Sequence, residues 1–93
     1  MGGKSLIMDQ EDSITLTIRS FLFPDEPIAG FQPGESFSMN VPGGTTMEEL
    51  TGKIYYKKFD QIGVMAVNGK LASAETILLS GDSVDFYPLL EGG

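Results

Sequence analysis

The sequence predicts an α+β domain in which one main helix lies across one face of a mixed sheet. Three features of the chain support this class. Two segments of alternating apolar residues flank a loop rich in proline and glycine, a capped amphipathic stretch follows, and further short apolar strands lead to the end. The 93 residues are enough for one domain with a single core, but not for a deep enclosed active site as well.

The first two strands are expected to form an antiparallel hairpin. Apolar and polar residues alternate over residues 13–23 and again over 35–41, with a loop at 24–34 between them. The residues expected to face the core from the first strand are Ile14, Leu16 and Ile18. Phe21 and Phe23 stand at the end of this strand, and we expect them to close the core rather than to form a docking surface.

The helix is expected to follow the turn at residues 42–44. Two overlapping Thr-x-x-Glu capping boxes are available to begin it, Thr45 with Glu48 and Thr46 with Glu49. An apolar stripe should lie on the sheet, and it consists of Met47, Leu50 and Ile54. Gly52 costs about 1 kcal/mol relative to alanine, so we expect the helix to stop or bend there. Lys57 and Lys58 are expected at the negative end of the helix dipole.

The remaining strands are expected to be short. Residues 64–67 are apolar and predict a strand that ends in an Asn68-Gly69 turn, because both residues tolerate positive φ. Residues 72–80 should form a loop with one apolar anchor, for which the candidates are Ile77, Leu78 and Leu79. A turn at 81–82 leads into a last strand at residues 83–87. One face of this strand carries Val84 and Phe86, and the other carries Asp85 and Tyr87.

The end of the chain is expected to leave the domain. Pro88 has no amide proton, so pairing should fail there and release residues 89–93 as a flexible tail. The domain would then span residues 13–88, after a flexible extension at residues 1–12. Gly92-Gly93 is thin enough to enter a narrow channel of a partner and present its carboxylate. The alternative is that glycine stands here by composition, because 12 of the 93 residues are glycine.

Composition argues against several classes of function. The formal net charge of −7 disfavours nucleic acid and anionic membranes as partners and favours a basic protein surface. The chain has no cysteine and no histidine, which removes thiolate metal sites and the commonest general base. We therefore expect neither a metal site nor a self-contained hydrolase or redox enzyme. No segment has the apolar length of a membrane span or of a signal peptide, so the cytoplasm is the expected location.

Four short motifs in the last third of the chain point to a known family. They are Val67-Asn68-Gly69-Lys70, Gly81-Asp82-Ser83-Val84, Phe86-Tyr87-Pro88 and Gly92-Gly93. Together they resemble the ubiquitin-like sulfur carriers, which are the small subunit of molybdopterin synthase and the thiamine-biosynthesis sulfur carrier. The resemblance covers residues 14–93 and implies the β-grasp fold. The aromatic-aromatic-proline motif is closer to the molybdopterin branch, whereas the proline-rich residues 21–33 depart from it.

The resemblance implies a carrier that reacts through its own terminus and is not an enzyme. An adenylating enzyme of the ubiquitin-activating type would use ATP to convert the Gly93 carboxylate into an acyl adenylate. Sulfur from a partner's persulfide would replace AMP, and the resulting thiocarboxylate would donate its sulfur to a precursor held by a synthase. This synthase would be the molybdopterin synthase large subunit or a thiazole synthase. The chain itself would bind no cofactor.

The resemblance also assigns roles along the tail. Gly93 would carry the reactive carboxylate, with Gly92 beside it. The expected partner-binding residues are Tyr87, Pro88, Leu89, Leu90 and Glu91. As alternatives, Leu89 and Leu90 would close the core and Glu91 would simply be solvated. Two other functions stay open: a ubiquitin-like modifier that forms isopeptide bonds with lysines, and a β-grasp interaction module without terminal chemistry.

Overall fold

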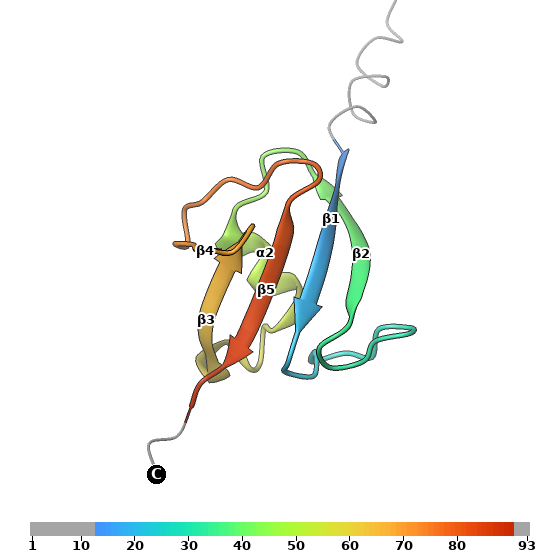
Figure 1. Cartoon of the computed structure of the whole chain (residues 1–93), viewed down its shortest axis with the longest axis vertical. Coiled ribbons are helices and arrows are strands. Elements are labelled where there is room, and N and C mark those ends of the chain that lie inside the picture. The colour runs from blue at the N-terminus through green and yellow to red at the C-terminus, as the bar shows by residue number, and fades with distance from the viewer. Residues whose placement is uncertain (1–12, 91–93) are drawn as a thin grey trace, which may run out of the picture.

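The computed structural model describes residues 13–90, which form a mixed five-stranded sheet with a helix across one face (Figure 1). The elements in chain order are β1 (Ser13–Ser20), β2 (Ser36–Pro42), α2 (Met47–Ile54), the 3-10 helix η1 (Phe59–Gln61), β3 (Ile62–Val67), β4 (Lys70–Leu71) and β5 (Ser83–Pro88). The strand order is β2-β1-β5-β3-β4. β1 and β5 are parallel, and the other neighbours are antiparallel. The predicted α+β class is therefore confirmed, whereas the predicted extension at residues 1–12 lies outside the described residues.

β1 and β2 form the predicted antiparallel hairpin. Their register places Ser13 opposite Pro42 and Arg19 opposite Ser36. The inward-facing residues of β1 are those that the alternation predicts: Leu16 and Ile18 are fully buried, and Ile14 packs partly buried against them. Every second side chain of a strand points to the same face, so the hairpin contributes one apolar face to the core.

Phe21 and Phe23 do not close the core, contrary to the prediction. Phe21 is 42% exposed and Phe23 is 59% exposed. The alternation of β1 continues past its last residue and brings Leu22, not its neighbours, against the core. Ser20 supports this course of the chain, because its hydroxyl accepts the Leu22 N–H at 3.1 Å. The two phenylalanines therefore face outward.

The helix α2 begins with the second of the two capping boxes. Thr46 is the N-cap, and its hydroxyl accepts the Glu49 N–H at 3.2 Å while the Glu49 carboxylate accepts the Thr46 N–H at 3.0 Å. The predicted stripe is confirmed, since Met47, Leu50 and Ile54 are all buried. These side chains fasten the helix to the sheet.

The predicted end of the helix is wrong. α2 runs through Gly52 to Ile54, so that Lys53 occupies the last turn and the two lysines at positions 57 and 58 lie beyond it. Two hydrogen bonds at buried residues stabilise the last turn of the helix. The Thr51 hydroxyl donates to the Met47 carbonyl at 2.7 Å, and the Tyr55 N–H donates to the Thr51 carbonyl at 2.7 Å. These bonds offset the low helix propensity of glycine.

Aromatic rings and a loop residue complete the core. Tyr55 and Phe86 are fully buried and meet edge to face, with ring centroids 5.2 Å apart. Leu78 is the buried anchor of the loop after β4, while its neighbours Ile77 and Leu79 are exposed. The Tyr55 hydroxyl donates to the Leu22 carbonyl at 2.7 Å. Burial raises the pKa of Tyr55, because the phenolate would lose its hydration.

Two motifs behind the family resemblance meet in space. The predicted Asn68-Gly69 turn joins β3 to β4, with φ values of 53° and 83°. The Asn68 amide nitrogen donates to an Asp82 carboxylate oxygen at 2.9 Å, and the Asn68 amide oxygen accepts the Ser83 N–H at 3.0 Å. The two turns therefore support each other at the start of β5.

Within residues 13–90, no helix has the length and apolar character needed to cross a membrane. In the same range, no group of three or more acidic, histidine or cysteine side chains is arranged to hold a metal ion.

Candidate functional site

The candidate site lies where β5 leaves the sheet. Val84 and Phe86 point into the core, and Asp85 and Tyr87 lie on the opposite face, as the alternation predicts. On that open face, the ring of Tyr87 stacks on the ring of Phe21, with centroids 5.3 Å apart and planes inclined by 13°. The outward course of Phe21 therefore serves a contact that the sequence analysis did not anticipate.

Pairing does not fail at Pro88, contrary to the prediction. Pro88 lies opposite Ile62 of β3, and the Leu89 N–H donates to the Gln61 carbonyl at 2.7 Å. The physical reason is the direction of the amides along β5. The Phe86 carbonyl accepts the Phe21 N–H on the β1 side of the strand, so the backbone of Pro88, two residues later, faces the same side.

Among residues 13–90, no strand lies beside Pro88 on that side, because β1 has already ended at Ser20. The missing N–H of proline therefore removes no ladder bond, whereas the next amide, that of Leu89, points towards β3. Proline is tolerated in a strand at such an edge position. The chain consequently stays attached to the sheet one residue longer than expected.

Gly63 of β3 lies directly against the backbone of Pro88 and Leu89. The register of β3 against β5 shifts between Ile62 and Val64, which marks an irregularity at Gly63. A methyl carbon at position 63 would lie 2.9 Å from both the Leu89 Cα and the Pro88 carbonyl oxygen. The backbones of β3 and β5 thus approach too closely at this point for any side chain.

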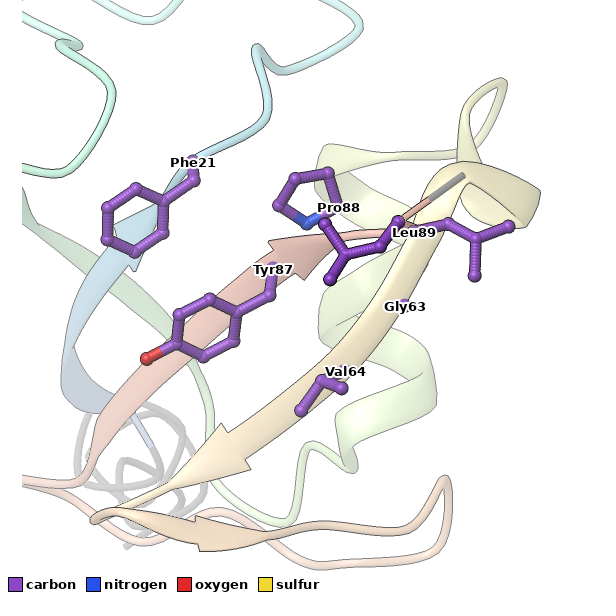
Figure 2. Close-up of a pocket in the computed structure, with 7 residues that line it drawn as sticks. Phe21, Gly63, Val64, Tyr87, Pro88 and Leu89 are labelled. Atoms are coloured by element: carbon purple, nitrogen blue, oxygen red, sulfur yellow. The ribbon is translucent and has the colours of Figure 1, made fainter. Parts of the chain in front are cut away.

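An apolar hollow of about 540 Å³ opens beside the end of β5. Figure 2 shows its lining residues grouped where β1 and β5 end and β3 begins. They are Phe21, Gly63, Val64, Tyr87, Pro88, Leu89 and Leu90. Leu89 is 55% exposed and Leu90 is 86% exposed, so neither leucine closes the core. The hollow therefore presents apolar surface to solvent at Leu89 and Leu90, where the chain leaves the sheet.

An ion pair borders the hollow on the open face. The Arg19 guanidinium donates to both carboxylate oxygens of Asp85, from Nε and from a terminal nitrogen, each at 3.2 Å. The hydrogen bond to Asp85 and its negative charge raise the pKa of Arg19. The guanidinium carbon also lies 5.5 Å from the centroid of the Phe21 ring. Arg19 therefore holds Phe21 in the position in which it meets Tyr87.

The described part of the chain includes only some of the predicted site residues. Tyr87, Pro88, Leu89 and Leu90 come together around the hollow. Glu91, Gly92 and Gly93 lie outside the described residues, so the role expected of the terminal carboxylate stays a prediction.

Three residues of the hollow were missed by the sequence analysis. Phe21 was assigned to the core, although its odd position in the alternation of β1 indicates the open face. Gly63 carries a usable signal, because a glycine within a strand marks a bulge or a close backbone approach. Val64 carries none, since an apolar residue of a short strand is normally counted as core.

Comparisons with known proteins find similarity in structure only. No family model matches the chain, and no curated protein sequence does. The HVO 2177 protein of Haloferax volcanii superimposes with a TM-score of 0.63 at 18% identity, over 88% of this chain and 89% of that one. SAMP1 of Haloferax volcanii gives a TM-score of 0.55 at 21% identity, over 85% of this chain and 99% of that one.

A third structure is a complex of subunits 1 and 2 of the molybdopterin-converting factor from Helicobacter pylori 26695. Its matching chain gives a TM-score of 0.53 at 21% identity, over 86% of this chain and 100% of that one. These similarities show the class of fold: the protein has the ubiquitin-like β-grasp fold. The β-grasp fold that the resemblance to the ubiquitin-like sulfur carriers implies is therefore confirmed.

Proposed function

We propose that this protein is a sulfur carrier whose terminal carboxylate, on Gly93, is activated and loaded with sulfur by partner enzymes. The observation that carries the proposal is the course of the chain after β5. Leu89 and Leu90 lead away from the core beside an apolar hollow, instead of folding back into the domain. At Leu90, the last described residue, the chain has therefore left its own core, as a terminus that partners must reach requires.

The proposed chemistry needs no catalytic group from this chain. A carboxylate oxygen of Gly93 attacks the α-phosphorus of ATP in the adenylating enzyme, and pyrophosphate leaves. A persulfide of a partner then attacks the carbonyl carbon, and AMP leaves. This step leaves an acyl disulfide between Gly93 and the partner's cysteine. A second thiolate of the partner attacks the sulfur that belongs to that cysteine, which forms a disulfide within the partner and releases the thiocarboxylate on Gly93. ATP is bound by the partner, so the chain holds no cofactor of its own.

The hollow supports the proposal by supplying a place for partners to dock. Tyr87, Pro88, Leu89 and Leu90 expose apolar surface there, and such surface on a small domain is typical of an interaction site. We propose Glu91 as a further contact to the partner. The net charge of −7 favours a partner with a basic surface, and the hollow favours an apolar protrusion on that surface.

The acceptor of the sulfur is proposed by analogy. One structural relative is found in a complex of subunits 1 and 2 of the molybdopterin-converting factor. This relative favours a molybdopterin-type synthase large subunit over a thiazole synthase as the second partner, in agreement with the Phe86-Tyr87-Pro88 motif. The assignment rests on the likeness of fold and motif.

The proposal is tested by intact-mass spectrometry. The full chain is incubated with ATP, its adenylating enzyme and a persulfide donor, and we expect the mass gain of one sulfur replacing one oxygen. A variant that lacks Gly92-Gly93 serves as the control and should gain nothing. An unchanged mass of the full chain would contradict the proposal. Adducts to lysines of other proteins would favour a ubiquitin-like modifier, and full function of the shortened variant would favour an interaction module.

A further inference from the structure

We infer that Gly63 is a positioning residue that fixes the direction in which the tail leaves the domain. The inference rests on the proposed function, since a fixed direction matters only if a partner receives the tail. It concerns a residue of β3 that is remote in sequence from the tail and has no side chain to contact a partner. Its effect must therefore pass through the backbone of Pro88 and Leu89.

The close approach at Gly63 carries the inference. A methyl carbon there would lie 2.9 Å from the Leu89 Cα, 2.9 Å from the Pro88 carbonyl oxygen and 3.2 Å from the Leu89 nitrogen. All three are backbone atoms, which cannot move aside by a change of rotamer. Relief of the clash requires that the chain at residues 88–89 be displaced from β3.

A hydrogen bond shows what the close approach achieves. The Leu89 N–H reaches the Gln61 carbonyl at 2.7 Å, across the irregularity between Ile62 and Val64. In the part of the chain that the structure describes, no strand pairs with Leu89 on the opposite side, because β1 ends at Ser20. The bond to Gln61 is thus the backbone contact that sets the course of the chain as it enters the tail, and Gly63 permits it.

The same contact aligns the tail with the hollow. Figure 2 shows Gly63 and then Val64 along β3, next to the end of β5 that carries Tyr87, Pro88 and Leu89. A partner that fills the hollow therefore meets the chain at Leu89 in a fixed position. Because Pro88 and Leu89 are already ordered before docking, fewer residues must be ordered during activation.

The first test measures how firmly the backbone at Leu89 is held to β3 in the absence of any partner. Hydrogen exchange of the Leu89 amide is followed by NMR in the full chain and in Gly63→Ala, with Gly52→Ala as the matched control. Gly52 is a suitable control because a methyl group there meets nothing within 4 Å. We expect the Leu89 amide to exchange roughly tenfold faster in Gly63→Ala while core amides of β5 keep their protection. Unchanged exchange at Leu89 would overturn the inference.

The second test measures activation. Exchange of pyrophosphate into ATP by the adenylating enzyme reports formation of the acyl adenylate. We expect kcat/KM to fall roughly 10- to 100-fold in Gly63→Ala, because a small misplacement of a reacting group has an effect of this size. Gly52→Ala should match the unaltered chain. Activation of Gly63→Ala at the normal rate would overturn the inference alone, whereas no activation of the unaltered chain would contradict the proposed function.

A second pair of variants covers the case in which Gly63→Ala unfolds. Leu89→Pro and Leu89→Ala both remove the leucine side chain, but only proline also removes the N–H that Gln61 accepts. We expect Leu89→Pro to be activated more slowly than Leu89→Ala, by roughly tenfold in kcat/KM. Equal rates for the two variants would overturn the inference, because the hydrogen bond would then have no effect on activation.

Discussion

Single side chains at the end of β5 decide what this domain offers to a partner. Tyr87 and Phe21 stack on each other, and Arg19 holds Phe21 through a cation–π contact while it pairs with Asp85. The charged groups of Arg19 and Asp85 are engaged with each other. What remains accessible is apolar surface, to which Leu90 adds the most exposed side chain.

Leu90 should therefore contribute to binding and not to folding. We predict that Leu90→Ala weakens binding to the adenylating enzyme by about 1–2 kcal/mol, as for a contact in a docking surface. Leu71→Ala is the matched control, since Leu71 of β4 is 82% exposed and does not line the hollow. Isothermal titration calorimetry measures the affinity, and thermal unfolding should show equal stability for both variants. Equal binding by both would remove Leu90 from the docking surface.

Tyr55 should make stability depend on pH. Its pKa is raised above the ordinary value of 10.0, chiefly by burial, so the neutral form stabilises the folded state. This contribution is fully present below about pH 10 and is lost as pH rises through the higher folded-state value. We predict that the free energy of unfolding falls above about pH 10 and that Tyr55→Phe reduces this fall. Chemical denaturation between about pH 8 and 11 measures it, and an equally steep fall in Tyr55→Phe would contradict the assignment.

At the scale of elements, alternation and capping predicted most of the fold. The hairpin, the stripe of α2, the Asn68-Gly69 turn and the two faces of β5 all follow from local patterns. The errors at Phe21 and Pro88 have different causes. The outward position of Phe21 follows from continuing the alternation of β1, so the local pattern contained it. The error at Pro88 depends on where β1 ends relative to β5. That position is set by pairing between residues far apart in the sequence, such as Arg19 with Asp85, and local sequence does not encode it.

The candidate site was predictable only in part for the same reason. Tyr87, Pro88, Leu89 and Leu90 are consecutive, so the family motif located them together. Gly63 reaches them only through the register of β3 against β5. A bulge at this glycine could be suspected from sequence, but its contact with the tail required the three-dimensional arrangement.

α2 offers a prediction at the scale of the element. Gly52 lies within the helix, and an added methyl group meets nothing within 4 Å. We predict that Gly52→Ala raises the free energy of unfolding by about 1 kcal/mol, because alanine has the higher helix propensity. Urea denaturation monitored by circular dichroism measures the change. A loss of stability would mean that the glycine is required for the end of the helix.

At the scale of the whole molecule, the chain combines a net charge of −7 with an exposed apolar hollow. The net charge of −7 should accelerate encounter with a basic partner, and the hollow should determine how long the complex lasts. The two contributions respond differently to salt, because ions screen charges over about 10 Å at 0.1 M but leave apolar contacts intact.

Binding to the adenylating enzyme should therefore weaken with ionic strength through its association rate. We predict a fall of roughly tenfold in the association rate constant between low and physiological salt, with little change in dissociation. Surface plasmon resonance measures both constants. Leu90→Ala should change dissociation instead. An association rate that is independent of salt would contradict the role assigned to the net charge.

The central claim is that the folded domain serves to present its terminal carboxylate to other proteins. The most direct measurement is sulfur loading, by intact mass, of a chain extended by a single alanine after Gly93. We predict that this variant folds and binds as the unaltered chain does but gains no sulfur, because its terminus is displaced and no longer as slender. Normal sulfur loading of the extended chain would contradict the claim.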